Sequence, residues 1–185
     1  MPNWCSNNFE VTGTKEQIDA FEDFLKTGSG KNWFDFFLPT PQELLDTVSG
    51  FVGEDKQAAH EAQQAANLEK YGYSDWYGWN ITNWGTKWNC DAQDYVREDN
   101  TIRFWFDSAW SPPIALYEFI ESEGFSVRGS FYEPGMCFVG EYSEGVDDTY
   151  EYSDTDSLDA IPEHLIEEYN IRDSFEEFYD GEENE

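Results

Sequence analysis

Two histidines and three cysteines are the residues of this sequence best suited to catalysis or metal binding. Neither His60 nor His164 lies near a serine or cysteine in a recognised nucleophile motif. His60 falls in a polar helical segment and His164 in an acidic one, so we expect both imidazoles to be solvated. Cys5, Cys90 and Cys137 form no CxxC pair, and their odd number and wide spacing predict reduced thiols buried as small apolar groups. These residues fall short of a zinc site. We therefore predict that the protein is not an enzyme and uses no metal or cofactor.

Acidic side chains are the most unusual feature of the composition. The chain has 185 residues, with 40 Asp and Glu against 10 Lys and Arg, and a formal net charge of −30. Phosphate binding depends on Lys and Arg, so this balance excludes direct binding to nucleic acid or to an anionic membrane. Aromatic residues make up 18% of the chain, which is the opposite of a disordered composition. We expect a folded protein whose partners are basic or uncharged.

The charge is concentrated in the last quarter of the chain. Residues 141–185 contain 18 acidic residues and one basic residue, Arg172. Leu158, Ile161 and Leu165 recur there at helical spacing, so one face can pack on the rest of the protein while carboxylates point outward. Such an array can imitate the phosphates of DNA and bind a basic groove. The candidate contact residues are Asp147, Asp148, Asp154, Asp156, Asp159, Glu163, Glu167, Glu168, Glu176 and Glu177.

Two simpler interpretations of these carboxylates stay open. They can form an acidic surface that only keeps the protein soluble. The aspartates between Asp147 and Asp159 can also gather calcium, but their spacing lacks the glycine and the final glutamate of a helix-loop-helix calcium site. Weak condensation of cations is the more common behaviour of such clusters.

A second concentrated feature is an aromatic cluster in residues 71–88, which hold four tryptophans and three tyrosines. It can be a structural clamp in the core, or a surface for a protein partner, where aromatic residues are the expected contact types. A stacking platform for single-stranded nucleic acid normally has a positive groove, which ten cations do not provide. A small-ligand cleft near Cys5, Asn83, Lys87 and Asn89 is a further alternative. The candidate aromatic residues are Trp76, Trp79, Trp84 and Trp88.

Hydrophobic periodicity indicates the elements that position these residues. Thr14 and Gln17 form a capping box at the start of a helix, after a strand at residues 9–12. Pro112 and Pro113 begin another helix, and Pro134 lies in the turn of a hairpin. The other expected elements are a short strand or aromatic loop at 32–38, helices at 42–46 and 54–70, part of a helix near 76–80, a strand at 101–106, and hairpin strands at 125–132 and 136–142.

This order predicts an α+β fold, with one antiparallel sheet and two helices on one of its faces. We expect one domain at residues 1–145, with a helical insertion at about 42–88. Residues 146–185 form an acidic C-terminal extension, predicted to be helical and packed on the domain. No segment has the composition of a signal peptide or the length of a membrane span, which predicts a cytoplasmic protein.

Three segments of the chain carry distinctive motifs: residues 1–7 (MPNWCSN), 83–88 (NWGTKW) and 110–113 (WSPP). Together they resemble the YubB ferredoxin-like family of phage and plasmid proteins, and the resemblance covers residues 1–145. A protein of such an origin is expected in the host cell cytoplasm. It implies the split β-α-β fold and an origin in a mobile genetic element, but no reaction. In that family the Trp-Gly-Thr-Lys-Trp motif usually ends in Asp, whereas Asn89 stands here and Asp91 follows two residues later. The acidic extension lies outside the resemblance.

These observations lead to one functional hypothesis and its alternatives. We expect a non-catalytic inhibitor from a phage or plasmid, an acidic nucleic-acid mimic that binds a basic host defence protein such as a CRISPR or restriction nuclease. The alternatives are an adaptor that binds proteins through its aromatic surface and, less favoured, a small-ligand-binding or enzymatic domain.

Overall fold

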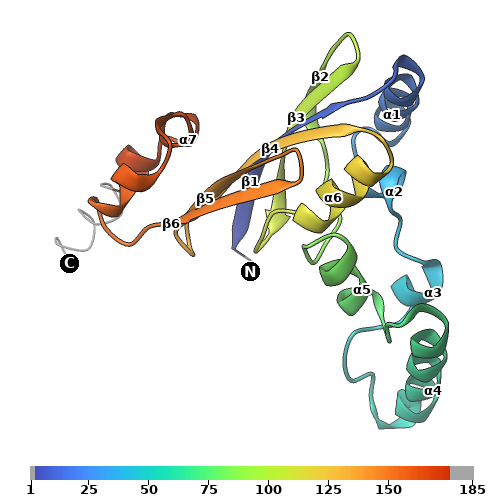
Figure 1. Cartoon of the computed structure of the whole chain (residues 1–185). Helices are drawn as coiled ribbons and strands as arrows, with labels where there is room; N and C mark the ends of the chain where they lie inside the picture. Colours follow the sequence, from blue (N-terminus) through green and yellow to red (C-terminus); the bar gives the residue numbers. More distant parts are fainter. Residues whose placement is uncertain (1–2, 176–185) are drawn as a thin grey trace.

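The chain folds around a six-stranded antiparallel sheet, shown in the computed structural model of residues 3–175 (Figure 1). Adjacent strands follow the order β2-β3-β1-β4-β5-β6. The central strand β1 pairs with both β3 and β4, and Asn8 lies opposite Trp105 on one side and Ser130 on the other. The strands are β1 (Trp4–Thr12), β2 (Gln93–Glu98), β3 (Thr101–Ala109), β4 (Ser126–Glu133), β5 (Phe138–Ser143) and β6 (Val146–Glu151).

The connections between these strands confirm the predicted split β-α-β fold. Strands β1 and β2 flank β3 and are each antiparallel to it, so they run parallel to each other with β3 between them. Strands β3 and β4 flank β1 in the same way, and the connection between them is the helix α6 (Ile114–Ser122). The first connection begins with the helix α1 (Lys15–Gly28), whose capping box of Thr14 and Gln17 is present as expected.

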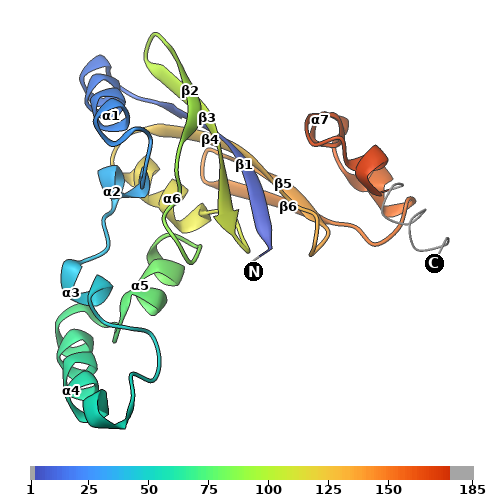
Figure 2. The same cartoon turned by 180° about the vertical axis from the view of Figure 1, so that it is seen from behind.

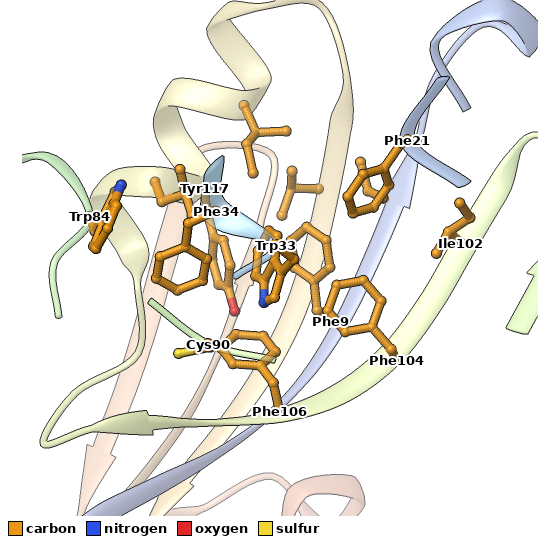
Figure 3. Close-up of a cluster of buried hydrophobic side chains, with 14 of the residues drawn as sticks. Phe9, Phe21, Trp33, Phe34, Trp84, Cys90, Ile102, Phe104, Phe106 and Tyr117 are labelled. Carbon is orange, nitrogen blue, oxygen red and sulfur yellow. The ribbon is translucent and has the colours of Figure 1, made fainter. Parts of the chain in front are cut away.

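One face of the sheet carries the main core. Figure 1 shows α1 and α6 on the same side of the sheet. Alternate residues of β1 and β3 point into this side, and they meet aromatic rings from the segment after α1 (Figure 3). The Phe9 ring lies 4.7 Å from Trp33 and 5.2 Å from Tyr117, measured between ring centroids. Aromatic packing therefore holds the sheet to the helices on this face.

The structure corrects the expected second strand of the sheet. Residues 32–38, expected as a strand or an aromatic loop, contain the short helix α2 (Phe34–Phe37), because a helical turn brings Trp33, Phe34 and Phe37 against the same core. The missing strand is β2, a polar edge strand with a register irregularity that gave little hydrophobic signal. Strand β1 also begins earlier than the predicted residue 9, since Cys5 and Asn7 alternate inward with Phe9.

The insertion between α2 and β2 is helical, as predicted. It comprises α3 (Gln42–Leu45), α4 (Glu54–Tyr71) and α5 (Trp76–Asn83), which extend from the sheet below α2 and α6 in Figure 1. Asn67 is the buried residue of α4, and its amide donates to the Thr47 hydroxyl at 2.9 Å. Helix α4 is thus held by polar contacts more than by an apolar face, in agreement with its Ala, Gln and Glu composition.

The opposite face of the sheet is partly covered by the end of the chain. The described residues after β6 form the 3-10 helix η1 (Ser157–Ala160) and the helix α7 (Glu163–Glu168), and Figures 1 and 2 show α7 across the sheet from α1 and α6. The acidic extension begins as strand β6, which was not expected. Glu144 and Gly145 form the turn before it, both with positive φ, and Val146, Asp148 and Tyr150 then alternate at the period of a strand.

Candidate functional site

The acidic extension, residues 146–175 of the described chain, is fastened to the sheet by a second apolar cluster. Val139 of β5 is fully buried beneath it, on the face opposite the main core. This cluster is separate from the main core, and it includes the three residues whose helical spacing predicted the packing. Its buried members are Val139, Tyr152, Leu158, Ile161, Leu165, Ile166 and Ile171.

Polar contacts also attach α7 to the sheet. The Glu168 carboxylate accepts hydrogen bonds from the Asn8 amide at 2.8 Å and from the Ser130 hydroxyl at 2.9 Å. The neighbouring Tyr169 ring packs against Trp105 at 5.9 Å between centroids, and burial raises the pKa of its hydroxyl. His164 pairs with Glu141 at 3.0 Å and remains exposed, as expected for this imidazole. The backbone of α7 is therefore held in one place.

Several predicted contact carboxylates hold the extension together. Asp154 accepts the Ser157 N–H at 2.8 Å, and this bond helps to lower the Asp154 pKa. Asp159 and Glu163 both lie near Arg172, the one cation of the extension. Glu168 makes the sheet contacts described above. Each of these residues has a structural role besides any role in partner binding.

Other predicted carboxylates point to solvent without a side-chain partner. Within residues 3–175, Asp148, Asp156 and Glu167 are exposed and make no hydrogen bond or ion pair through their carboxylates. Asp147 is exposed and accepts the Thr149 hydroxyl at 3.1 Å, while desolvation raises its pKa. Glu176 and Glu177 lie outside the described residues. Free carboxylates are thus carried on β6, beside η1 and on α7.

The cations of the chain do little to neutralise this surface. Six of the ten Lys and Arg form ion pairs within residues 3–175, and only Arg172 among them belongs to the extension. Arg97, for example, joins β2 to α1 through Asp19 at 2.6 Å and Glu22 at 2.7 Å. Most carboxylates of the extension therefore have no Lys or Arg of the described chain beside them to offset their negative charge.

The four candidate tryptophans divide into two groups. Trp79 and Trp84 belong to the main core, and the Trp84 indole donates to the Leu38 carbonyl at 2.8 Å. Trp76 is half-buried, and Trp88 is 39% exposed with the Lys87 ammonium 4.7 Å from its ring centroid. Trp79 and Trp84 therefore act in the structural clamp, while Trp76 and Trp88 reach the surface.

The two tryptophan-containing motifs pack against each other. The Ser111 hydroxyl donates to the Gly85 carbonyl at 2.7 Å, and the Thr86 hydroxyl donates to the Ala109 carbonyl at 2.8 Å. Gly85 has φ +87°, and a Cβ there would lie 3.2 Å from the Ile114 backbone nitrogen. These contacts join α5 to the start of α6, which gives both motifs a structural role.

The small-ligand cleft expected near Cys5, Asn83, Lys87 and Asn89 is not assembled as such. Cys5 is fully buried in β1, and the Asn83 amide donates to the Trp79 carbonyl at 2.9 Å. Asn89 instead lines a groove of about 330 Å³, together with Trp76, Trp84, Trp88 and Asp35. Sequence reasoning missed Asp35, whose only signal was its place within the aromatic run at residues 32–38.

The cysteines and histidines of the described chain lie in different environments. Burial raises the pKa of the Cys5 and Cys90 thiols, which lowers the fraction present as reactive thiolate. Cys137 is only half-buried, contrary to expectation, because it lies in the turn between β4 and β5. The Nε2 atom of His60 is enclosed without a hydrogen-bond partner, so this imidazole is less solvated than expected. Between residues 3 and 175 no group of His, Cys, Asp and Glu is arranged to hold a metal ion.

Comparison with known proteins identifies no family. No protein-family model and no curated protein matches the chain. Among solved structures, the crystal structure of protein api92 from Yersinia pseudotuberculosis, described under family DUF1281, aligns with a TM-score of 0.43 and 12% sequence identity. The alignment covers 83% of this chain and 99% of that chain. No helix within residues 3–175 is long and apolar enough to cross a membrane. Function must therefore be inferred from the residues of this chain.

Proposed function

We propose that this protein is a non-catalytic inhibitor that binds a basic nucleic-acid-binding protein through the carboxylates of its acidic extension. The proposed partner is a host defence protein such as a CRISPR or restriction nuclease, and the resemblance to the YubB family supports an origin in a phage or plasmid. The extension occupies the groove that normally holds DNA or RNA, with its carboxylates in place of phosphates.

One observation carries this proposal: the extension is an ordered part of the fold and also strongly acidic. Its apolar residues are buried around Val139, and Glu168 ties α7 to β1 and β4. Carboxylates on a fixed backbone bind a complementary surface without the entropy cost of ordering a loose tail. A sequence selected only for solubility has no need of a buried apolar face beneath its charges.

The uncompensated charge also suits rapid association with a basic groove. A concentrated field of one sign steers an oppositely charged partner toward it and raises the association rate at low salt. Asp148, Asp156 and Glu167 are the first candidates for direct contact with the bound protein. Their carboxylates make no ion pair or hydrogen bond within residues 3–175, so binding would disrupt no such contact. Asp154, Asp159, Glu163 and Glu168 contribute charge while holding the extension in place.

Charge reversal distinguishes binding through the acidic extension from a general effect of the protein's negative charge. The test variant carries Asp148→Lys, Asp156→Lys and Glu167→Lys, and the matched control carries Asp23→Lys, Glu69→Lys and Glu118→Lys. The control residues are exposed on α1, α4 and α6, and their carboxylates form no ion pair in the described chain. Both variants change the net charge equally. Each protein is used to capture partners from a bacterial lysate, followed by elution with duplex DNA.

The proposal expects the wild type and the control to retain a DNA-binding protein that added DNA displaces. The test variant should lose that partner, and added salt should weaken its capture by the wild type. Equal capture by all three proteins would reject the acidic extension as the binding surface.

An adaptor function is favoured by a different observation. Trp4 is 50% exposed, and its ring centroid lies 6.2 Å from that of Trp88. Trp110, the residue directly after β3, is 47% exposed. Large exposed rings are typical of binding hot spots. Loss of a captured partner in Trp4→Ala and Trp88→Ala, with retention in the charge-reversal variant, would support this function instead.

A further inference from the structure

The groove beside α3 and α5 combines aromatic walls with one carboxylate. Its volume is about 330 Å³, and Trp76, Trp84 and Trp88 line it together with Asp35 and Asn89. Its lining residues come from α2, α3, α5 and the segment after α5, and Figure 1 shows these helices on the opposite side of the sheet from α7. It is therefore a separate feature of the surface.

The Asp35 side chain is held in a defined position by one of its carboxylate oxygens, while the other can still accept hydrogen bonds. The Asn89 amide donates to Asp35 Oδ1 at 2.8 Å, whereas Oδ2 has no hydrogen-bond partner in the described chain. Asn89 is itself fixed, because its side-chain oxygen accepts the N–H groups of Phe34 and Cys90 at 3.1 Å and 2.9 Å. The second carboxylate oxygen is thus free to accept hydrogen bonds from a ligand.

The indole rings supply a surface suited to a cation. Trp84 is fixed by its bond to Leu38 and by its edge-on contacts with Phe34 and Trp79. Trp88 already has the Lys87 ammonium over its ring, so this indole attracts positive charge. The lining of the groove thus combines the buried and fixed indole of Trp84, the partly exposed indoles of Trp76 and Trp88, and a carboxylate oxygen without a partner in the described chain.

We propose that this groove binds the guanidinium group of an arginine side chain. A guanidinium is planar and weakly hydrated, so it can stack on an indole while its N–H groups donate to a carboxylate. A lysine ammonium is more strongly hydrated and does not stack in this way. Anionic ligands are repelled by Asp35 and by the net charge of −30. The site does not depend on the acidic extension, so either proposal can fail without the other.

The test uses the full-length protein and short blocked peptides. Acetyl-Gly-Arg-Gly-amide is titrated while the indole N–H signals are followed by NMR, with assignments from Trp76→Phe and Trp88→Phe. The expected result is a saturable shift of the Trp76, Trp84 or Trp88 signals. Asp35→Asn should weaken binding by about tenfold, because a hydrogen bond to a charged group is lost. This variant can still accept the Asn89 amide through its side-chain oxygen, so its fold is preserved.

Matched controls make the result decisive. Glu69→Gln removes one exposed charge from α4 without touching the groove, and it should leave the affinity unchanged. The same peptide with lysine, and tetramethylammonium as a stackable cation without donors, should produce much smaller shifts. No shift with the arginine peptide, or equal shifts with all three ligands, would overturn the guanidinium site. Unchanged affinity in Asp35→Asn would overturn the role of the carboxylate.

Discussion

The carboxylate of Glu168 accepts a hydrogen bond from the amide of Asn8 at 2.8 Å, which joins the end of the chain to the central strand of the sheet. The same carboxylate accepts the Ser130 hydroxyl from the neighbouring strand. Since Asn8 lies opposite both Trp105 and Ser130, α7 is anchored over the middle of the sheet. A residue predicted to contact a partner therefore positions the surface that carries the other carboxylates.

Removing apolar packing beneath α7 should destabilise the protein. Leu165 is fully buried in the second apolar cluster, so Leu165→Ala should lower the free energy of unfolding by about 2–5 kcal/mol. Denaturant unfolding followed by circular dichroism measures this loss. Glu167→Ala, on the exposed side of the same helix, should change the stability by less than about 0.5 kcal/mol. Equal stability of Leu165→Ala and the wild type would show that the extension is not packed on the sheet.

The ion pair between Lys70 and Glu43 should be visible in a titration. Their charged groups lie 2.7 Å apart, and the contact lowers the pKa of Glu43 from 4.5 to about 2. A lowered pKa in the folded state stabilises the fold above the unfolded value, and this contribution disappears as the pH falls toward 2. Lys70→Met should raise the pKa of Glu43 toward 4.5, measured by NMR of the carboxyl carbon. Lys56→Met removes a lysine of the same helix that forms no ion pair within residues 3–175, and it should leave that pKa unchanged.

Replacing Asn89 by aspartate tests the link between the aromatic motif and Asp35. The substitution keeps an oxygen for the Phe34 and Cys90 N–H groups but removes the amide that donates to Asp35. Two carboxylates then face each other, which should raise the pKa of Asp35 further and destabilise the protein by about 1–3 kcal/mol. Adding Asp35→Asn to Asn89→Asp should recover part of the lost stability in a double-mutant cycle. Strict additivity of the two substitutions would contradict this contact.

Gly85 should tolerate no side chain. Its φ of +87° is unfavourable for other residues, and a Cβ would lie 3.2–3.4 Å from backbone atoms at the start of α6. Gly85→Ala should therefore lower the free energy of unfolding by about 1–3 kcal/mol. Gly28→Ala is the control, because a Cβ there meets no atom within 4 Å and the residue is helical, so it should be neutral or slightly stabilising. A neutral Gly85→Ala would show that the motif is not packed in this way.

Local sequence patterns predicted the helices and strands that are bounded by capping or turn residues. Thr14 and Gln17 marked the first helix, and the period of the apolar residues marked α6 and the hairpin of β4 and β5. Strand β2 was missed because it is a polar edge strand, and α2 was missed because consecutive aromatic residues show no period. Both errors arise where long-range packing, rather than local pattern, decides the conformation.

The candidate sites were predictable to different degrees. The burial of Leu158 and Leu165 follows from their spacing, and so does the outward direction of the intervening carboxylates. The attachment of Glu168 to Asn8 does not, because it joins residues 160 positions apart through side chains alone. The groove at Asp35 was equally hidden, since its walls come from three separate segments of the chain.

The position of β6 and β2 at the two edges of the sheet has a consequence for association between copies of the chain. An unpaired edge strand offers its backbone to any neighbouring strand and so invites aggregation. Here β6 carries Asp147, Asp148 and Glu151, and β2 carries Asp94 and Glu98 together with an irregular register. Two such edges repel each other when they approach. Acidic residues at both edges therefore disfavour edge-to-edge pairing between copies of the chain.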